Sequence, residues 1–399
     1  MEQLVTSDFK LGIIAGGQLG KMLVLAASNW DVKTYVMDKD DHCPASTSCT
    51  HFVQGDNTNY DDVVRFGKMV DMITFEIENI NIEALKTLKA MGKRIKPDPD
   101  ILETIQDKGY QKLFYKDNRI PTSPFRLLEG KEEINKALSN GDLSYPFVQK
   151  LRKGGYDGRG VAVIKSEADN DLLLNGPSVI EEMVDIQKEI SVIAARNARG
   201  EVRCFPVVEM EFNAEANLVE RLVCPAAIDH SHEMQAQDLA TEIAEALDLQ
   251  GIIAVEFLID QKDQLMVNEI APRPHNSGHH TIESSITSQF EQLLRAIFNF
   301  PLGSTQLKLP SVMINLLGEP NHVGKVKYEG LTESMKIDGV KIHLYGKKLT
   351  QPFRKMGHVT IMDSSIEKAK MKAELVKNQL KIKSWKNQSL ASSWAPTPT

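Results

Sequence analysis

Two short apolar runs that carry carboxylates constrain the fold of this chain more than any other feature. Residues 254–260 (AVEFLID) place Glu256 among apolar neighbours, and residues 265–269 (LMVNE) end in Glu269. The polar residues 261–264 separate the runs, so the pattern predicts a β-hairpin. A carboxylate in a buried run needs a partner, and we expect Glu256 and Glu269 to converge on one face as oxygen ligands for Mg²⁺ that carries nucleotide phosphates. The residues alone also allow two edge carboxylates that face solvent.

Hydrogen-bond donors crowd the loop that follows the second run. Residues 270–276 are IAPRPHN, in which two prolines stiffen the backbone around Arg273, His275 and Asn276. Such donors beside a carboxylate pair indicate an anionic substrate that faces a nucleotide.

The length and the charge of the chain exclude several classes of protein. At 399 residues it exceeds what one hydrophobic core usually supports, so we expect two or three domains. A formal net charge of -7 provides no basic field for a nucleic acid, and we expect no nucleic-acid partner. The apolar runs are too short to span a membrane and the N-terminus lacks a secretory signal, so a cytoplasmic protein without a membrane partner is expected. No CxxC spacing joins the cysteines, which we expect to be reduced thiols: Cys43, Cys49, Cys204 and Cys224.

The N-terminal third begins with a strand, a glycine-rich turn and a helix. Residues 10–15 are apolar, residues 16–20 are GGQLG, and residues 22–28 follow a helical pattern. This order predicts a Rossmann-like unit whose helix N-terminus offers free N–H groups to an anion. A second predicted strand ends at Asp38, so a nicotinamide-dependent oxidoreductase is an alternative. The spacing GxxxGGxxG differs from GxGxxG and favours a phosphosugar.

Further acidic and basic residues follow predicted strands. Glu76 and Glu78 alternate with apolar residues after the predicted strand 71–75, at the sheet edge where open α/β sheets bind ligands, although a solvated strand exit fits as well. Lys108 lies in a predicted helix over residues 101–116, and Lys150 ends a predicted strand.

A loop rich in glycine comes next. Residues 154–161 (GGYDGRGV) lie between two predicted strands, which predicts a hairpin loop whose amides can close over phosphates. It lacks the GxxxxGK[ST] pattern of a P-loop, and a mobile surface hairpin is the alternative. In the C-terminal third we expect a helix over residues 279–300 and then strands over residues 311–316, 341–345 and 358–362.

These segments, in this order, resemble the ATP-grasp superfamily, and within it the N5-carboxyaminoimidazole ribonucleotide synthetase family. The segments that carry the resemblance are GGQLGKM, TFEIENI, VQKLRKGGYDGRG, EEMV with KEISV, VEFLID, NEIAPRPHNSGHH, YGK and RKMGHVT. Together they extend over almost the whole chain to about residue 383, and NEIAPRPHNSGH is the most specific of them.

The resemblance implies a mixed α/β fold in three domains. These are a Rossmann-like domain over residues 1–105, an ATP-grasp domain over residues 106–300 and a small β-rich domain over residues 301–384, followed by a disordered tail over residues 385–399. It also implies a homodimer. The activity implied is the carboxylation of 5-aminoimidazole ribonucleotide with ATP and bicarbonate, through carboxyphosphate, in purine biosynthesis.

The resemblance also implies roles for particular residues, with ATP and Mg²⁺ as cofactors. The residues that would bind ATP are Lys108, Lys150, Gly155, Tyr156, Asp157, Gly158, Arg159, Gly160, Val161, Glu181, Glu182, Met183, Val184, Glu189, Asn268 and Glu269. Those that would bind the ribonucleotide are Gln18, Leu19, Glu76, Arg273, His275, Asn276, Lys347, Arg354 and Lys355. Around the transferred group would lie Tyr156, Asp157, Arg159, Arg273, His275 and Lys347, and the metal would be held by Glu256 and Glu269.

Some alternatives stay open. Without the resemblance, Lys347, Arg354 and Lys355 fit an ordinary solvated hairpin rim as well as a phosphate clamp. Where the family often has ENxH, this chain has residues 209–212 as EMEF, and we expect no nucleotide contact there. The rival functions are another ATP-grasp enzyme, such as the formate-using glycinamide ribonucleotide transformylase, and a nucleotide-sensing protein without turnover.

Overall fold

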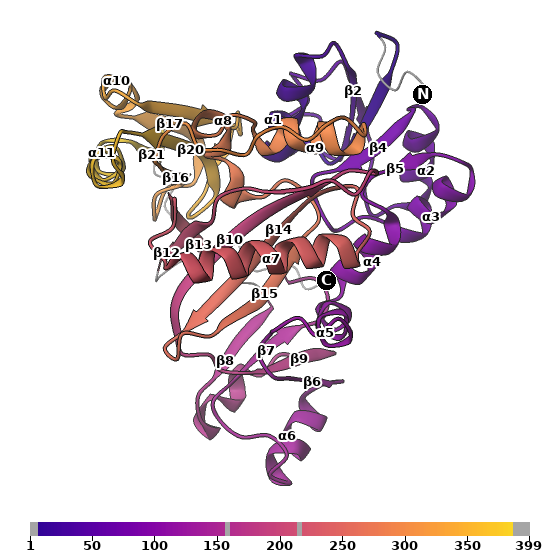
Figure 1. Cartoon of the computed structure of the whole chain (residues 1–399), viewed down its shortest axis with the longest axis vertical. Coiled ribbons are helices and arrows are strands. Elements are labelled where there is room, and N and C mark those ends of the chain that lie inside the picture. The colour runs from indigo at the N-terminus through magenta and orange to yellow at the C-terminus, as the bar shows by residue number, and fades with distance from the viewer. Residues whose placement is uncertain (1–6, 156–159, 214–217, 386–399) are drawn as a thin grey trace.

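The computed structural model describes residues 7–155, 160–213 and 218–385. Four residues of the glycine-rich loop, at 156–159, and the tail from residue 386 lie outside the described residues. In Figure 1 the N-terminal segments (indigo) lie at the upper right and the C-terminal ones (yellow) at the upper left. A lobe formed by residues 125–182 lies at the bottom, and a long sheet runs between these parts.

The N-terminal segment forms a parallel sheet with the strand order β3-β2-β1-β4-β5. This is the order of a Rossmann-type unit, so the predicted Rossmann-like fold is confirmed. The elements are β1 (Lys10–Ile14), α1 (Gln18–Ser28), β2 (Lys33–Asp38), β3 (His51–Gln54), α2 (Tyr60–Lys68), β4 (Met72–Phe75), α3 (Ile82–Ala90) and β5 (Arg94–Ile95). Ile14 and Phe75 are paired at the carboxyl ends of β1 and β4, which places the glycine-rich turn beside Glu76.

The helix predicted over residues 101–116 is two helices, α4 (Pro99–Gln106) and α5 (Lys108–Asp117). Asp107 separates them because its carboxylate accepts the N–H groups of Gly109 and Tyr110 as the N-cap of α5. Arg152 Nε donates to the same carboxylate at 2.8 Å. The break at Asp107 matters for the site, because the cap holds the first turn of α5 beside Arg152. Lys108 lies in this turn.

The lower lobe is a four-stranded antiparallel sheet with the order β6-β9-β7-β8. Its elements are β6 (Phe125–Leu128), α6 (Lys131–Ser139), β7 (Phe147–Leu151), β8 (Val161–Ile164), the short 3-10 helix Glu167–Leu172 and β9 (Ser178–Glu182). Lys150 pairs with Val161 in β7 and β8, so the hairpin predicted around the glycine-rich loop is confirmed. A Cβ at Gly160, whose φ is +71°, would lie 3.2 Å from Gly155 Cα, which explains the need for glycine there.

The long sheet has the strand order β15-β14-β10-β12-β13-β16-β20-β18, with β11 paired to β10. Its central elements are β10 (Ile186–Arg196), β11 (Val202–Cys204), β12 (Val208–Asn213), β13 (Leu218–Cys224), α7 (His230–Ala246), β14 (Gly251–Asp260) and β15 (Leu265–Ala271). Alternate side chains of β14, such as Val255 and Phe257, pack with the buried face of α7. The opposite face of β14 carries Glu256 because side chains alternate along a strand.

The strands of the C-terminal segment do not form one separate sheet, because three of them belong to the long sheet. These three strands, β16 (Ser311–Leu317), β20 (Lys355–Met362) and β18 (Val340–Leu344), extend the long sheet through the pairing of β16 with β13. A second, three-stranded sheet has the order β19-β17-β21. The remaining elements are β17 (Gly324–Glu329), α10 (Leu331–Met335), β19 (Leu349–Thr350), α11 (Ile366–Gln379) and β21 (Lys381–Ser384).

The helix predicted over residues 279–300 is also interrupted. It is divided into α8 (Thr281–Ser284) and α9 (Gln289–Ile297). Ser285 is extended and the Ser288 side chain caps α9 by accepting the Glu291 N–H, so local serine chemistry overrides the helical spacing. The buried face of α9 packs in one hydrophobic cluster with α1 and Tyr345 and thereby joins the three parts of the chain.

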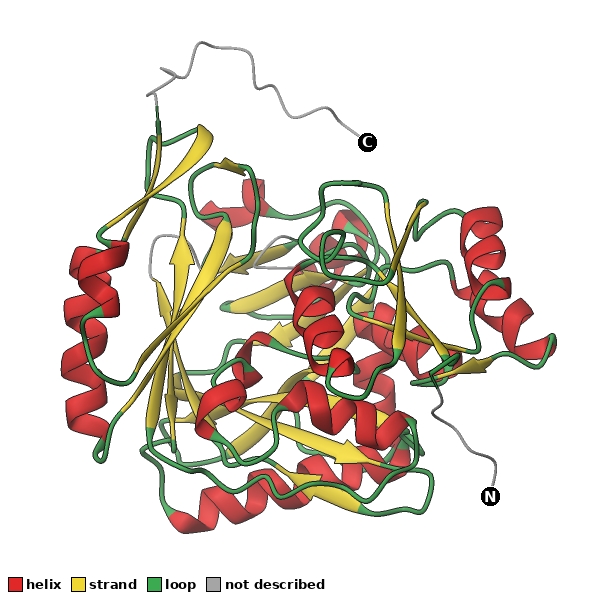
Figure 2. Cartoon of the chain, turned by 90° about the horizontal axis from the view of Figure 1, so that it is seen from above, coloured by secondary structure: helices red, strands yellow, loops and turns green. Residues whose placement is uncertain are grey.

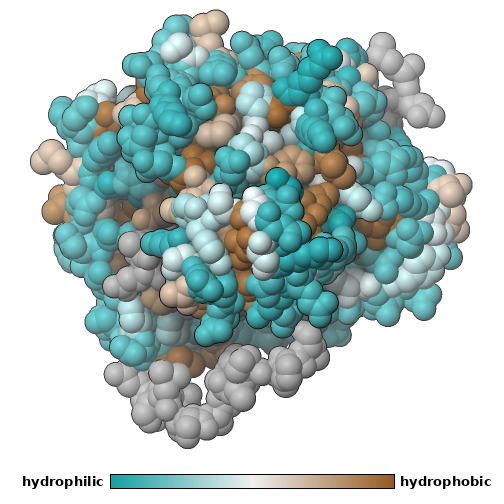
Figure 3. Space-filling view, turned by 90° about the horizontal axis from the view of Figure 1, so that it is seen from below, coloured by the Kyte–Doolittle hydropathy of each residue, from teal (hydrophilic) through white to brown (hydrophobic). Residues whose placement is uncertain are grey.

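Two further views show the arrangement of the helices and one face of the surface. Figure 2, the view from above, shows helices on either side of the strands, and Figure 3, the view from below, shows a mainly hydrophilic face with small separate hydrophobic areas. Within the described residues, no helix has the length and apolar character needed to cross a membrane. All four cysteines are free thiols.

Candidate active site

The carboxylate pair predicted on the hairpin is present. Glu256 in β14 lies directly opposite Glu269 in β15, and a register shift beside them leaves Asn268 as an extra residue. A β-bulge of this kind re-aims side chains, and here Asn268 and Glu269 both face the same gap. Burial and repulsion by Glu269 raise the pKa of Glu256 to about 7. Two carboxylates that repel each other in this way form a site where a cation is favoured.

Lysines from two different elements reach this pair. Lys108 Nζ, on α5, lies 2.7 Å from Glu269 Oε2. Lys150 Nζ, on β7, lies 3.0 Å from Asn268 Oδ1 and 2.9 Å from Glu181 Oε2. The structure therefore brings together residues that the sequence predicted separately. Charged groups on the large sheet face charged groups on the small sheet across a narrow gap.

A third lysine at this gap, Lys112, was missed in the sequence. Its Nζ lies 3.0 Å from Glu181 Oε1, and both side chains are almost fully buried. It also donates to the hydroxyl groups of Thr122 and Ser123. Burial opposes ionisation of Glu181, but Lys150 and Lys112 lower its pKa to about 2. The available signal was spacing: Lys112 follows Lys108 by four residues and therefore lies on the same face of α5.

Glu189 completes the set of charges. It lies on β10 opposite Leu258 of β14, and Leu258 is two residues from Glu256 along that strand. Burial raises the pKa of Glu189 to about 6, and Lys150 partly offsets this. The chain passes from the small sheet to the large one after Glu182, the last residue of β9. Met183 and Val184 lie in this connection to β10. The gap itself has a volume of only about 10 Å³, because the lysines and carboxylates fill it.

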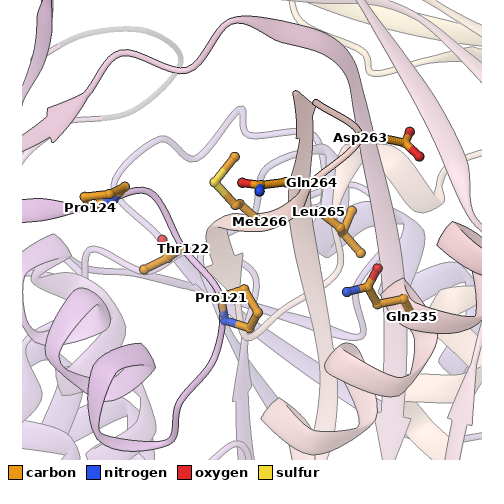
Figure 4. Close-up of a pocket in the computed structure, with 8 residues that line it drawn as sticks. All are labelled: Pro121, Thr122, Pro124, Gln235, Asp263, Gln264, Leu265 and Met266. Atoms are coloured by element: carbon orange, nitrogen blue, oxygen red, sulfur yellow. The ribbon is translucent and has the colours of Figure 1, made fainter. Parts of the chain in front are cut away.

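A second, more open pocket lies elsewhere among the described residues. It has a volume of about 510 Å³ and lies between the Pro121–Pro124 connector, α7 and the start of β15 (Figure 4). Its lining residues are Pro121, Thr122, Pro124, Gln235, Asp263, Gln264, Leu265 and Met266. This lining has one carboxylate and no lysine or arginine, so it lacks the charges that the gap at Glu256 offers to a nucleotide.

The donor loop after β15 links the gap to the N-terminal sheet. Arg273 Nη2 lies 2.6 Å from Glu78 Oε1. His275 Nε2 lies 3.4 Å from Glu256 Oε1, and His275 Nδ1 accepts the Ser277 N–H at 3.3 Å. Burial, Arg273 and Lys355 lower the pKa of His275 to about 3, so its ring is neutral. Asn276 Nδ2 is buried and has no hydrogen-bond partner within the described part of the chain, as expected of a donor that awaits a ligand.

The glycine-rich turn differs from its prediction. Glu76, which directly follows β4, accepts the N–H groups of Gly17 and Gly20. These donors were expected to be free for an anion. The reason is topological, since β1 and β4 are adjacent and their carboxyl ends meet. Burial raises the pKa of Glu76 to about 7 although both amides act to lower it. Gln18 and Leu19 lie between the two occupied amides, on the first turn of α1.

The predicted basic clamp lies beside α1, although its residues are more than three hundred positions away in the chain. Lys21 Nζ donates to Leu344 O at 3.3 Å, immediately before Tyr345-Gly346-Lys347. Lys347 Nζ donates to Lys355 O at 2.8 Å, and partly buried Arg354 donates to Leu349 O at 2.7 Å. Lys355 is also near enough to His275 for its charge to affect that pKa. Lys21 is a further residue that the sequence interpretation left out, although it lies within GGQLGKM.

Two predicted regions receive less support. Tyr156, Asp157, Gly158 and Arg159 lie outside the described residues, so the structure does not place them. At the segment EMEF, Glu209 pairs with Lys188 at 3.0 Å and Phe212 is exposed at the end of β12.

The class of protein is defined by lysines on α5 and on the small sheet that face a pair of carboxylates on the large sheet. The ATP-grasp domain profile matches residues 113–290, the ribonucleotide synthetase preATP-grasp domain profile matches residues 9–106, and the profile of the phosphoribosylaminoimidazole carboxylase C-terminal domain matches residues 311–372. The chain is thus built as an ATP-grasp protein.

Individual relatives narrow the class to one family. A protein of Bacillus subtilis (strain 168) named N5-carboxyaminoimidazole ribonucleotide synthase is 34% identical over 365 residues, which cover 90% of this chain and 93% of that protein. The chain belongs to the N5-carboxyaminoimidazole ribonucleotide synthase family, as the sequence motifs predicted.

Solved structures agree. The crystal structure of N5-carboxyaminoimidazole ribonucleotide synthetase from Thermotoga maritima matches with a TM-score of 0.86 and 42% identity, over 94% of this chain and 99% of that one. An enzyme from Aspergillus clavatus in complex with ADP and 5-aminoimidazole ribonucleotide matches with a TM-score of 0.84 and 30% identity, over 94% of this chain and 99% of that one.

Proposed function

We propose that this chain is an ATP-dependent carboxylating ligase that converts 5-aminoimidazole ribonucleotide and bicarbonate to N5-carboxyaminoimidazole ribonucleotide through carboxyphosphate, in purine biosynthesis. The observation that carries the proposal is that the loop after β15 contacts both the N-terminal part of the chain and the carboxylate pair. Arg273 and His275 touch the acidic side chains Glu78 and Glu256, which belong to the N-terminal sheet and to the carboxylate pair. Reactants bound on the two sides of this loop would meet at Arg273 and His275.

ATP would bind in the gap between the two sheets. Lys108 and Lys150 would exchange their carboxylate and amide partners for phosphate oxygens, which form charge-assisted bonds of the same kind. The main chain of residues 181–184 would meet the adenine edge, and Glu189 would accept from the ribose hydroxyl groups. The loop from Gly155 to Val161 would cover the phosphates, with Tyr156, Asp157 and Arg159 near the transferred group.

The residues at the hairpin fit Mg²⁺. Glu256 and Glu269 provide two carboxylates and Asn268 an amide oxygen, which are the hard oxygen ligands that Mg²⁺ takes in nucleotide sites. The pKa of Glu256 is raised to about 7 by burial first and then by the nearby carboxylates, and a bound cation would offset both effects. When bound, the metal would neutralise charge on the transferring phosphoryl group. Within the described residues no group of three or more acidic, histidine or cysteine side chains could hold a metal by itself, so phosphate oxygens would complete the coordination.

The ribonucleotide would lie between α1 and the C-terminal strands. Gln18, Leu19 and Glu76 would face its base, and Asn276 would supply the buried donor that has no hydrogen-bond partner among the described residues. Its 5′-phosphate would be held by Lys347, Arg354 and Lys355. The contact between Lys21 and Leu344 supports this arrangement, because it holds the glycine-rich turn against the basic segment.

The chemistry needs a site without water, because water destroys activated bicarbonate. Lys108 and Lys150 would stabilise charge on the phosphoryl group during its transfer to bicarbonate. His275 is neutral and its Nδ1 accepts from Ser277, so its Nε2 carries the proton and can donate to an anionic intermediate. The phosphoryl transfer would leave ADP and carboxyphosphate. The exocyclic amine of the ribonucleotide would then attack the carboxyl carbon of carboxyphosphate and displace phosphate, or attack the CO₂ that remains after carboxyphosphate has lost phosphate, and in both cases the amine would lose one proton.

The decisive experiment is an assay of phosphate release from ATP. Release should require both bicarbonate and 5-aminoimidazole ribonucleotide, and the carboxylated ribonucleotide should accumulate in equal amount. Formate with glycinamide ribonucleotide should give no release. Turnover with that second pair would indicate the transformylase, and nucleotide binding without any turnover would indicate a sensor.

We propose further that the protein acts in the cytoplasm as a homodimer. The resemblance to the family supports the dimer, and the composition supports the location. Light scattering coupled to gel filtration measures the mass in solution, and a mass near that of one 44.6 kDa chain would contradict the dimer.

A further inference from the structure

Three imidazole rings form a stack where the donor loop meets the C-terminal strands. His279, four residues after His275, lies with its ring centroid 4.6 Å from that of His358 on β20. The ring of His343 on β18 lies on the other side of His358 at 4.4 Å, with an angle of 10° between the planes. His279 and His358 are fully buried, and His343 is partly exposed. We call these three rings the histidine stack.

Neighbouring groups hold the histidine stack at both its middle and its outer end. Tyr345 Oη and His358 Nδ1 share a hydrogen bond of 3.0 Å. His343 Nε2 lies 2.6 Å from Glu283 Oε1 on α8. His358 Nε2 has no partner within the described residues, so the ring has one hydrogen-bond partner and no facing carboxylate. A neutral imidazole satisfies such an environment better than an imidazolium, which would need acceptors at both nitrogens.

The stack connects two parts of the proposed ribonucleotide site. His279 continues the segment that contains His275 and Asn276, and α8 follows it directly. Tyr345 precedes Lys347 by two residues, and Lys355 precedes His358 by three residues on the same strand. In Figure 1, α8 lies beside β20, as the ring contacts require. Any change in the stack therefore changes the distance between the basic segment and the donor loop.

We propose that the histidine stack positions Lys347 and Lys355 relative to His275 and Asn276, and thereby sets the fit of the site to the 5′-phosphate of its ribonucleotide. This inference rests on the proposed function. His279, His343 and His358 are positioning residues that act through their neighbours and do not touch the substrate. Flat rings stacked between two segments resist lateral shifts, and flexible side chains of similar polarity do not.

A matched pair of substitutions at His343 tests the role of the ring, because this partly exposed position tolerates change better than the two buried ones. His343→Phe keeps a flat ring over His358, and His343→Gln keeps a hydrogen bond to Glu283 but removes the ring. We expect the Gln variant to raise the KM for 5-aminoimidazole ribonucleotide about tenfold, with the KM for ATP changed by less than about twofold. The Phe variant should stay within about threefold of the wild-type protein for both.

The binding of the dephosphorylated nucleoside adds a readout that general loosening of the fold would not produce. The Gln variant should lose affinity for the ribonucleotide and keep its affinity for the nucleoside. In a Lys355→Ala background, the same His343→Gln change should alter the ribonucleotide KM by less than about twofold, because the residue through which it acts is gone.

Three results would overturn the inference. These are equal effects of Phe and Gln, equal losses of nucleoside and nucleotide, and effects of His343→Gln and Lys355→Ala that simply add. The wild-type assay separates this inference from the proposed function. If the wild-type protein does not turn over the ribonucleotide, the proposed function fails; if it does and the variants behave alike, only the positioning role fails.

Discussion

Replacing Glu269 by glutamine tests the central assignment of the site. The change keeps the size of the side chain but removes one negative charge opposite Glu256, and it removes the partner that Lys108 contacts at 2.7 Å. Losing one charged ligand contact costs about 1.5 to 3 kcal/mol. At about 1.4 kcal/mol for each factor of ten, the Mg²⁺ concentration needed for half-maximal turnover should rise about ten- to more than a hundredfold.

The same substitution should also change how metal binding depends on pH. In the wild-type protein the pKa of Glu256 is about 7, so protons compete with the metal as the pH falls below this value. The apparent Mg²⁺ affinity should then fall up to about tenfold per pH unit below pH 7. Without Glu269 the repulsion disappears and the pKa of Glu256 falls, so this pH dependence should weaken in the variant.

The assay is ATP turnover in the presence of both other substrates, titrated with Mg²⁺ at several pH values between 5.5 and 8, which brackets the pKa of about 7 at Glu256. Glu291→Gln is the matched control, because Glu291 pairs with Arg295 on α9, away from the gap. In urea titrations, both variants should unfold in a single cooperative transition, which would show that they are folded before urea is added. A Glu269→Gln protein with the wild-type Mg²⁺ requirement and the wild-type pH dependence would refute the metal site.

Three further predictions follow from other contacts. Lys112→Met should lower the free energy of unfolding by about 3 kcal/mol, the low end for a broken buried pair because Lys150 still holds Glu181, and a loss below about 1 kcal/mol in urea titrations would contradict the contact. Arg354→Ala should raise the KM for 5-aminoimidazole ribonucleotide about ten- to a hundredfold and leave the KM for ATP unchanged, whereas no change in either would make Arg354 an ordinary rim residue. The pKa of Glu76 is raised from 4.5 to about 7, so its carboxyl stabilises the fold below pH 4.5 and this contribution is lost as the pH rises through 7. Glu76→Gln should therefore gain stability relative to the wild-type protein by up to about 3 kcal/mol between pH 5 and pH 8 in chemical denaturation, and a constant difference would show that burial does not shift Glu76.

Much of the fold was predictable because its signals are local. The alternation of apolar and charged residues around Glu256 and Glu269 predicted the hairpin, and the order of strand, glycine turn and helix predicted the Rossmann-like sheet. Glycines at 154–160 between two strands predicted the loop at Lys150. In each case the residues that carry the signal are neighbours in the chain, so periodicity and turn chemistry determine the outcome. The boundaries of the helices near Asp107 and Ser288 escaped prediction because the side chain of each of these residues accepts backbone N–H groups as the N-cap of a new helix.

The assignment of partners was decided by tertiary structure. Glu76 accepts the amides of Gly17 and Gly20 in the glycine turn, a pairing that the sequence did not predict, because β1 and β4 are adjacent. Lys112 meets Glu181 only because α5 lies against β9. Nothing local indicates either pairing, since the partners are more than fifty residues apart.

The histidine stack shows the same division. The sequence by itself determined which residues can stack, bind phosphate or hold a metal, because those properties belong to the side chains. The structure decided that His279, His343 and His358 meet, because β16 and β20 extend the long sheet and bring the C-terminal strands against α8. Strand order and register determine which distant side chains touch. Both depend on the free energy of the whole packed core, which no single segment of the sequence determines.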